Sequence, residues 1–151
     1  MGNKCLVIGG DGFLGSHVVD DLLDRGFEVH VFDRFHKGRI KNLKHLKGKI
    51  KFHKGNFLNK WHLSRALKGV DYVFHFVSLS TPASTANDPH EEIRLNLDGT
   101  LQLLDLCVKH GIKKVVYPSS GGAVYGNGLE EVASETTQPR PVSPYAVTKL
   151  T

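Results

Sequence analysis

The chain has 151 residues, of which 40% are apolar and 23% charged, as in an ordinary soluble globular domain with its own core. No apolar run approaches the roughly 20 residues that cross a bilayer, and the N-terminus lacks the long apolar segment of a secretory signal. We therefore expect a cytoplasmic protein that does not engage a membrane. The two cysteines, Cys5 and Cys107, lie in apolar stretches and are expected to be reduced core residues.

The net charge of +5 is unevenly distributed. The basic segment, Arg34–Lys68, holds twelve Lys and Arg and no acid, whereas the rest of the chain holds eight basic and fifteen acidic residues. Such a stripe could attract nucleic acid or another polyanion. No nucleic-acid-binding module surrounds it, so we interpret it as a solvated face and expect no nucleic-acid partner. It could still steer anionic cofactors or substrates.

Short apolar strands alternate with longer amphipathic segments along the chain. Repeated βα units with buried strands predict a doubly wound α/β fold of the Rossmann type, with a parallel sheet covered on both faces. In chain order we expect strand Lys4–Ile8, helix Phe13–Asp24, strand Glu28–Phe32, an irregular or weakly helical link Gly38–Leu46, strand Ile50–His53, helix Trp61–Leu67, strand Asp71–Val77, helix Pro89–His110, strand Lys113–Tyr117 and a last helix from Ser143.

The two helices of the C-terminal half carry further expectations. The apolar faces of helix Pro89–His110 are expected to come from five leucines. Ser143 and Pro144 are an N-cap and a first-turn proline, and the helix that they begin has hardly started when the chain stops. We therefore expect residues 1–151 to be one domain that is cut after this helix begins. The five leucines are Leu95, Leu97, Leu101, Leu104 and Leu106.

A glycine turn follows the first strand and begins the first helix, with glycines at positions 9, 12 and 15. This spacing differs from the usual Gly-x-Gly-x-x-Gly, but the physics is the same. Glycines allow tight turns and close approach of the backbone to a pyrophosphate, and the N–H groups of the helix start point at the anion. The strand–turn–helix context favours a dinucleotide-binding turn.

Asp33 ends the second strand, eighteen residues after Gly15. A carboxylate there can accept hydrogen bonds from the adenosine ribose and would repel a 2′-phosphate, which favours NAD over NADP. The alternative is an acid on the surface at the end of a strand. Arg34 and Lys37 leave a second alternative open, since nearby cations could tolerate a 2′-phosphate.

Tyr145 and Lys149 are four residues apart, so on a helix they share one face. A neighbouring ammonium stabilises a phenolate, and a tyrosine so placed can exchange a proton with a substrate hydroxyl while a hydride moves to or from a nicotinamide. The pair has this meaning only because it follows the glycine turn and Asp33 in this order.

Together these motifs resemble the extended short-chain dehydrogenase/reductase family of NAD-dependent nucleotide-sugar epimerases and dehydratases, over essentially the whole chain. Gly55-Asn56, His75–Ser78, Asn96–Thr100 and the segment from Ser119 to Gly126 match further family motifs. The resemblance implies NAD as the cofactor and Tyr145, Lys149 and Ser120 as catalytic residues. The cofactor-binding positions that it implies are Gly9, Gly12, Phe13, Leu14, Gly15, Asp33, Arg34, Asn56, Phe57, Phe76, Val77, Ser78, Asn96, Ser119, Tyr145 and Lys149.

The chain departs from the family pattern at Gly121, where a catalytic Ser or Thr is usual, and Ser120 is the neighbouring hydroxyl. Dehydratases of the family resemble Thr-Asp-Glu-Val-Tyr-Gly in this segment, whereas this chain has Gly121-Gly122-Ala123 before Val-Tyr-Gly. Loss of water needs a proton donor that these residues do not supply, so an epimerase is favoured over a dehydratase.

The resemblance therefore implies epimerisation of a nucleoside-diphosphate sugar at C4, with a UDP-sugar as the substrate and transient hydride transfer to NAD. A dehydratase, decarboxylase or reductase is the alternative within the family. It also implies a homodimer that pairs the helices of Asn96 and Tyr145, and a C-terminal substrate region that this piece lacks. We expect the parent protein to be an enzyme and this piece alone not to turn over.

Other classes of site find little support. The nine histidines have no zinc-ligand spacing, so no metal is expected; His75 is expected to pack in a strand and the other histidines to lie on the surface. No Gly-Lys-Ser/Thr follows the glycines, and no Gly-x-Ser-x-Gly elbow occurs. The rival that stays open is a non-catalytic NAD-binding module or an inactive fragment, because Gly121 replaces the usual hydroxyl.

Overall fold

A computed structural model describes residues 3–35, 40–78, 89–127 and 132–151. The chain forms two compact units, and each is described by itself. The first unit comprises residues 1–77 and 102–117, and the second comprises residues 78–101 and 118–151.

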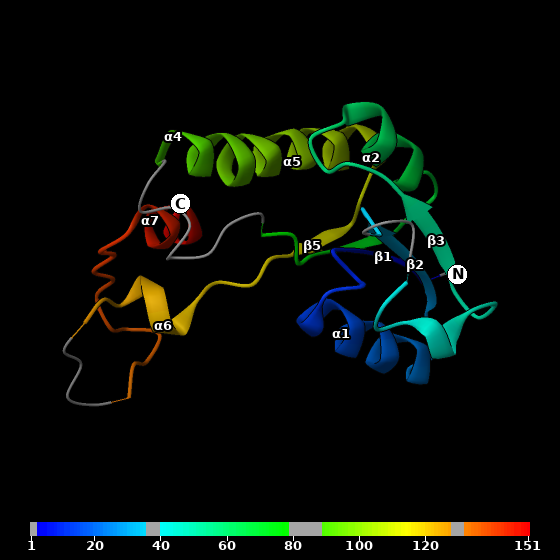
Figure 1. Ribbon diagram of the computed structural model, residues 1–151, viewed down its shortest axis with the longest axis horizontal. Coiled ribbons are helices and arrows are strands. Elements are labelled where there is room, and N and C mark those ends of the chain that lie inside the picture. Colours follow the sequence, from blue (N-terminus) through cyan, green and yellow to red (C-terminus); the bar gives the residue numbers. More distant parts are fainter. Residues whose placement is uncertain (1–2, 36–39, 79–88, 128–131) are drawn as a thin grey trace. The chain divides into compact units, whose positions relative to one another are not determined.

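The first unit is built on a five-stranded parallel sheet (Figure 1). The strand order is β3-β2-β1-β4-β5, so β1 lies in the middle and β3 and β5 form the edges. This order changes direction at β1, which is the doubly wound arrangement that the βα alternation predicts. The strands are β1 (Lys4–Ile8), β2 (Glu28–Asp33), β3 (Lys51–Lys54), β4 (Tyr72–His75) and β5 (Lys114–Val116).

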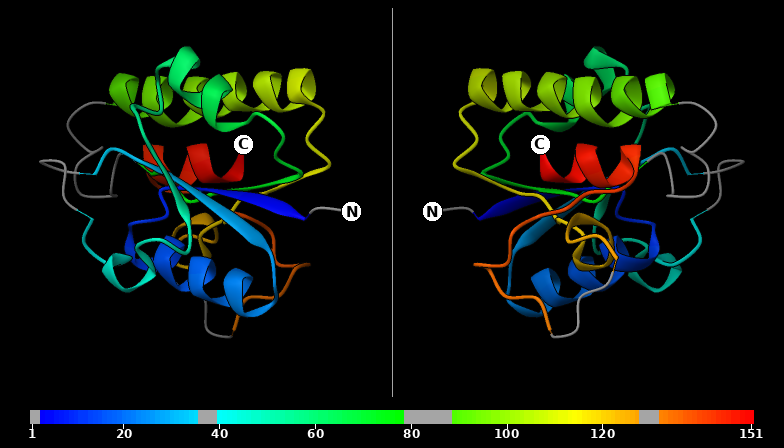
Figure 2. Two further views of the ribbon diagram at one scale, coloured as in Figure 1. Left: turned by 90° about the vertical axis from the view of Figure 1, so that its right-hand side faces the viewer. Right: turned by 90° about the vertical axis from the view of Figure 1, so that its left-hand side faces the viewer.

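Helices cover both faces of this sheet, with α1 (Phe13–Asp24) on one side and α2 (Lys60–Ala66) and α5 (Gly99–His110) on the other (Figure 2). Side chains alternate along β1, so Cys5 and Val7 join the cluster beneath α1, whereas Leu6 and Ile8 join the cluster beneath α2 and α5. Burial on both faces explains why β1 is apolar from Cys5 to Ile8. The prediction that both cysteines are buried and reduced is confirmed.

The second unit contains short helices and connecting segments. It comprises α4 (Pro89–Glu92), the π-helical segment η3 (Ile93–Asp98), α6 (Gly121–Val124) and α7 (Pro144–Leu150). In this unit α7 packs against α6, α4 and η3. Among the described residues, both core clusters consist of residues of the first unit.

The structure corrects two predictions about the helix expected at Pro89–His110. It is interrupted by η3, where the hydrogen bonds widen to the π pattern. Its expected apolar face is also wrong in part. Leu101 and Leu104 are exposed, and Leu103 is fully buried instead. Four of the six residues 101–106 are leucines, which left the buried face ambiguous, and the widened turn shifts the register. Leu97 is partly buried and Leu106 is buried, whereas the side chain of Leu95 lies outside the described part.

Two smaller differences concern a short helix and one histidine. Helix α6 was not predicted, since two glycines favour a loop. The link after β2 agrees with the prediction in its described part, where residues 44–46 form one 3₁₀ turn. His75 is buried as predicted, but His30 is buried as well and is not on the surface.

Candidate functional site

The glycine turn between β1 and α1 is a tightly packed backbone structure. Gly9 has a φ of +77°, its N–H donates to the Phe32 carbonyl oxygen at 2.8 Å, and its own carbonyl accepts from the Gly12 N–H at 3.1 Å. A Cβ on Gly9 would lie 3.0 Å from the backbone of Phe76, and a Cβ on Gly15 would overlap the Gly9 carbonyl oxygen. These two positions therefore accept only glycine.

The start of α1 is open to an anion. Gly12 is the N-cap and offers no side-chain acceptor, and the first turn contains no acid. Phe13 and Leu14 in this turn expose 76% and 58% of their surface. The N–H groups of the first turn and the positive end of the helix dipole are thus available, and this cradle fits a pyrophosphate.

Asp33, predicted to bind the adenosine ribose, holds backbone groups of the first unit. Its Oδ2 accepts the Asp11 N–H at 3.1 Å, and its Oδ1 accepts the N–H groups of Arg34 at 2.7 Å and Phe35 at 3.4 Å. An ionised carboxylate has about four lone-pair sites, so capacity for a ribose hydroxyl remains. Asp33 therefore ties the glycine turn to the end of β2.

Asp11 inside the glycine turn is a contact that the sequence analysis missed. Its carboxylate accepts the backbone N–H groups of Lys41 and Asn42, each at 2.8 Å, and of Leu43 at 3.2 Å. The Asn42 side chain donates to the Asp11 carbonyl at 2.7 Å. Asp11 thus fastens residues 41–43 to the glycine turn. The signal in the sequence was an acid among glycines, but its partner lies thirty residues away.

A pocket of about 710 Å³ of empty volume adjoins the end of β2, and two of the predicted cofactor residues, Arg34 and Asn56, line it with Lys54, Gly55 and His62. The Asn56 N–H donates to His62 Nδ1 at 3.1 Å, and Asn56 Oδ1 accepts the Leu58 N–H at 3.1 Å.

Three other predicted cofactor residues near this end of the sheet do not line the pocket of Arg34 and Asn56. The side chain of Phe57 is buried and stacks on His75, with ring centroids 4.9 Å apart, so it is part of the core. Phe76 and Val77, which the resemblance assigns to the cofactor site, follow β4 and lie against Gly9 of the glycine turn. Lys37 lies outside the described residues.

Helix α7 of the second unit brings Tyr145 and Lys149 together as their spacing predicts. Ser143 Oγ accepts the Ala146 N–H at 3.1 Å, so the predicted N-cap is confirmed. Lys149 Nζ lies 6.0 Å from the centroid of the Tyr145 ring and donates to the Pro118 carbonyl at 3.3 Å. A cation on the ring face at this distance is favourable.

Glu92 is a second contact that the sequence analysis missed. It is 1% exposed, and its Oε1 accepts a hydrogen bond from Thr148 Oγ1 at 2.6 Å, whereas its buried Oε2 has no hydrogen-bond partner among the described residues. Burial lowers the pKa of Lys149, and the negative charge of Glu92 acts in the opposite direction. Glu92 therefore favours the charged form of the predicted catalytic lysine. Nothing in the sequence pattern relates α4 to α7.

The remaining predicted residues of the second unit differ in exposure. Asn96 is buried in η3, whereas Ser78 and Ser119 are exposed. The Ser120 carbonyl accepts the first hydrogen bonds of α6, but its hydroxyl makes no capping bond. A Cβ on Gly121 would meet no atom within 4 Å.

Two classes of site are not found among the described residues. No group of three or more His, Cys, Asp or Glu there could hold a metal ion. None of the described helices is both long and apolar enough to cross a membrane.

The doubly wound parallel sheet and the uncapped helix after its first strand define a nucleotide-binding α/β protein of the Rossmann type. The model of the NAD-dependent epimerase/dehydratase family matches residues 5–151, and the chain belongs to this family.

Relatives within the family carry out different reactions. The chain is 36% identical to UDP-N-acetyl-alpha-D-glucosaminuronate decarboxylase of Bacillus cytotoxicus, over 85% of this chain and 39% of that protein. It is 36% identical to the decarboxylating sterol-4-alpha-carboxylate 3-dehydrogenase of Mus musculus, over 97% of this chain and 38% of that protein. The crystal structure of UDP-glucose 4-epimerase from Thermus thermophilus in complex with NAD matches with a TM-score of 0.87 and 40% identity. The match covers 97% of this chain and 47% of that chain. The chain thus spans less than half the length of each.

Proposed function

We propose that the chain binds NAD and that the whole protein epimerises a nucleoside-diphosphate sugar, with a UDP-sugar as the substrate. The observation that carries this proposal is the pairing on α7 of a tyrosine with a half-buried ammonium, in a chain whose first helix begins with an anion cradle. The NAD complex of the Thermus thermophilus epimerase supports the choice of cofactor.

In this proposal the first unit contributes mostly backbone to the cofactor. Gly9, Gly12 and Gly15 allow the chain to approach the pyrophosphate, and the N–H groups at Phe13 and Leu14 point to it. The remaining lone pairs of Asp33 accept from the adenosine ribose, and Arg34 and Asn56 line the pocket next to it.

The second unit contributes side chains to the chemistry. Bound NAD supplies a hydride acceptor and donor. The Tyr145 oxygen takes the proton of the sugar hydroxyl and later returns it, while the Lys149 ammonium stabilises the phenolate. Glu92 keeps that ammonium charged against the effect of burial. Ser120 is the proposed hydroxyl that orients the substrate, since its side chain is not used as a helix cap.

The segment around α6 favours epimerisation over dehydration. A dehydratase must protonate a leaving hydroxyl, and α6 is formed by Gly121–Val124 without a titratable side chain. Epimerisation needs one acid–base group that acts in both directions. Decarboxylases among the relatives make the removal of CO₂ from a UDP-uronic acid the alternative that an assay must separate.

The cofactor is tested by calorimetric titration of the chain with NAD and NADP. We expect saturable NAD binding and weaker NADP binding, because the Asp33 carboxylate repels a 2′-phosphate. Asp33→Ala should abolish NAD binding, but it also releases the Asp11 N–H and so loosens the turn. Asp33→Asn keeps one acceptor oxygen and is the matched control: it should retain the fold and lose the preference against NADP. Absence of NAD binding in a folded chain contradicts the proposal.

The reaction is tested in the whole protein with UDP-glucose and UDP-glucuronic acid as separate substrates. Formation of the C4 epimer, lowered by roughly 10²–10⁴-fold in Tyr145→Phe, supports the proposal. Release of CO₂ from the uronic acid identifies a decarboxylase instead. NAD binding without turnover of either substrate favours the non-catalytic module.

A further inference from the structure

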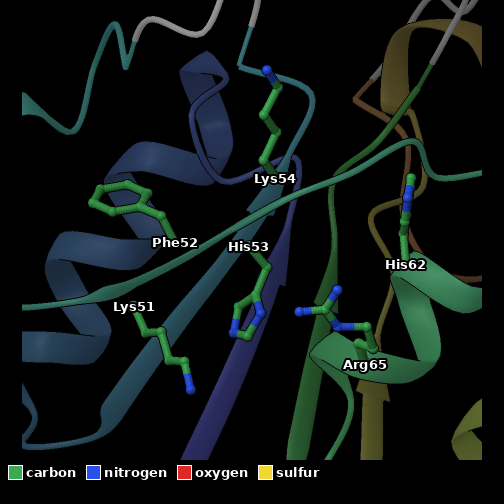
Figure 3. A pocket seen from close by; sticks show the side chains of 6 residues that line it. All are labelled: Lys51, Phe52, His53, Lys54, His62 and Arg65. Carbon is green, nitrogen blue, oxygen red and sulfur yellow. The ribbon is translucent and has the colours of Figure 1, made fainter.

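A basic pocket lies away from the glycine turn, between the edge strand β3 and helix α2 (Figure 3). Its empty volume is about 700 Å³, open solvent included. Figure 3 shows Lys51, His53 and Lys54 projecting from β3 and Arg65 extending from α2 toward His53. The lining residues are Lys51, Phe52, His53, Lys54, His62 and Arg65.

The imidazoles of this pocket are oriented by hydrogen bonds. The Glu28 carboxylate only accepts, so the buried His30 donates to it through Nε2, at 3.1 Å. His30 Nδ1 then accepts from His53 Nε2, also at 3.1 Å. His62 Nδ1 accepts the Asn56 N–H, which leaves its Nε2–H as a donor. The chain Glu28–His30–His53 therefore holds the His53 ring in place.

The charges of the pocket have one sign. Among the described residues no carboxylate pairs with Lys51, Lys54 or Arg65, and the whole basic segment contains no acid. These side chains offer N–H donors and no negative acceptor, so a complementary ligand is a compact anion that accepts several hydrogen bonds.

We propose that this pocket binds a phosphate-type oxyanion, a binding site separate from the glycine turn. Lys51 and Arg65 flank His53 and would contact the oxyanion, and Lys54 and His62 also line the pocket next to Asp33. The phosphate is therefore either a free phosphate or diphosphate, or a phosphate group of a nucleotide that reaches across from that second pocket. The site does not require the proposed epimerase activity.

Occupancy of the pocket should be visible at His53. Burial, and then the charges of His30, Lys51 and Arg65, lower the pKa of this imidazole from 6.5 to about 4. An oxyanion that offsets Lys51 and Arg65 raises this pKa, so its binding takes up a proton and strengthens as the pH falls. A diffuse attraction to the surface would not select this ring.

The test is titration of the chain with pyrophosphate while the ring protons of His53 are followed by NMR, with His53→Gln used for assignment. We expect saturable binding, a higher pKa of His53 in the complex, and roughly tenfold weaker binding in Lys51→Gln and in Arg65→Gln. Arg65→Lys should restore part of the loss. Lys47→Gln is the matched control, since it removes the same charge from an exposed position of the basic segment outside the pocket.

Parallel titrations with NADP and with a DNA duplex separate the sources. A shift of the His53 signal by NADP at lower concentration than by pyrophosphate assigns the phosphate to a nucleotide and supports the site. If Lys47→Gln and Lys51→Gln weaken pyrophosphate binding equally and the His53 signals do not shift, the proposed site is overturned in favour of a diffuse electrostatic attraction. Salt-sensitive DNA binding without pyrophosphate binding overturns it in favour of a nucleic-acid surface. Unchanged NAD binding in Arg65→Gln shows that the fold and the cofactor site are intact.

Discussion

The two units of this chain form their functional groups in different ways. In the first unit the predicted cofactor site is mainly backbone: a glycine turn locked between β1, β2 and the residues after β4. In the second unit two of the three predicted catalytic groups, Tyr145 and Lys149, are side chains on a seven-residue helix, α7. Both apolar clusters lie in the first unit, whereas α7 packs against α6, α4 and η3 and is also held by a capping serine and by the Glu92–Thr148 contact.

The two groups of residues are therefore sensitive to different kinds of substitution. A backbone site tolerates surface changes but no added atom, because its shape is enforced by close packing. A side-chain site tolerates added atoms but depends on a few polar partners. Substitutions of one chemical type should therefore have unequal effects in the two units.

The largest expected effect comes from added side chains at glycines. Gly15→Ala should destabilise the first unit by about 1–3 kcal/mol or more and abolish NAD binding, because its Cβ would overlap the Gly9 carbonyl. Gly122→Ala in α6 is the matched change in the second unit, where a Cβ meets nothing within 4 Å. It should leave stability equal or raise it by up to about 1 kcal/mol. Chemical denaturation and NAD calorimetry measure both, and equal losses would remove the distinction between the units.

Acid should weaken the first unit through His53. Its pKa falls from 6.5 to about 4 on folding, so the folded chain binds fewer protons than the unfolded chain between these values. The stability contributed by neutral His53 is complete above pH 6.5 and is lost as the pH falls toward 4. Hydrogen exchange at β2 and β3 should accelerate over this range, and His53→Gln should reduce that pH dependence. An unchanged profile in His53→Gln would assign the acid sensitivity to other groups.

In the second unit the negative charge of Glu92 should affect the pKa of Lys149. Glu92→Gln should lower the pKa of Lys149 further below its usual value, because the carboxylate opposes the effect of burial. Thr148→Val removes the 2.6 Å hydrogen bond but keeps the charge, so it should cost stability and leave this pKa nearly unchanged. The carbon shifts of the Lys149 side chain, followed by NMR against pH, measure it. Equal pKa values in the two variants would mean that the Glu92 charge is not the cause.

The smallest expected effect on stability comes from removing the N-cap side chain of one helix in each unit. Asn59 Oδ1 accepts the N–H groups of Trp61 and His62 at the start of α2, and Ser143 caps α7. Asn59→Ala and Ser143→Ala should each cost about 1 kcal/mol. Because Leu63 holds α2 in the core, only α7 should fray, which hydrogen exchange at α7 would detect. Equal fraying of α2 and α7 would contradict the expectation that the core of the first unit holds its helix more firmly than polar contacts hold α7.

The sequence alone determined the order and type of most elements and the identity of the main motifs. β1 and α1 have the predicted bounds, because strand burial and helix periodicity are local patterns that end at a glycine turn. The pairing of Tyr145 with Lys149 was predictable for the same reason, since helical spacing alone places them together.

The contacts between residues that are distant in the chain became visible only in the folded structure. It turned the leucine-rich helix so that Leu103 and not Leu104 is buried, and it introduced the π segment. It brought Asp11 to residues 41–43, Glu92 to Thr148 and His30 to His53. Each of these contacts joins two segments that are far apart in the sequence. The pattern of side chains within one segment does not reveal which charges or hydrogen-bonding groups of another segment will lie beside it.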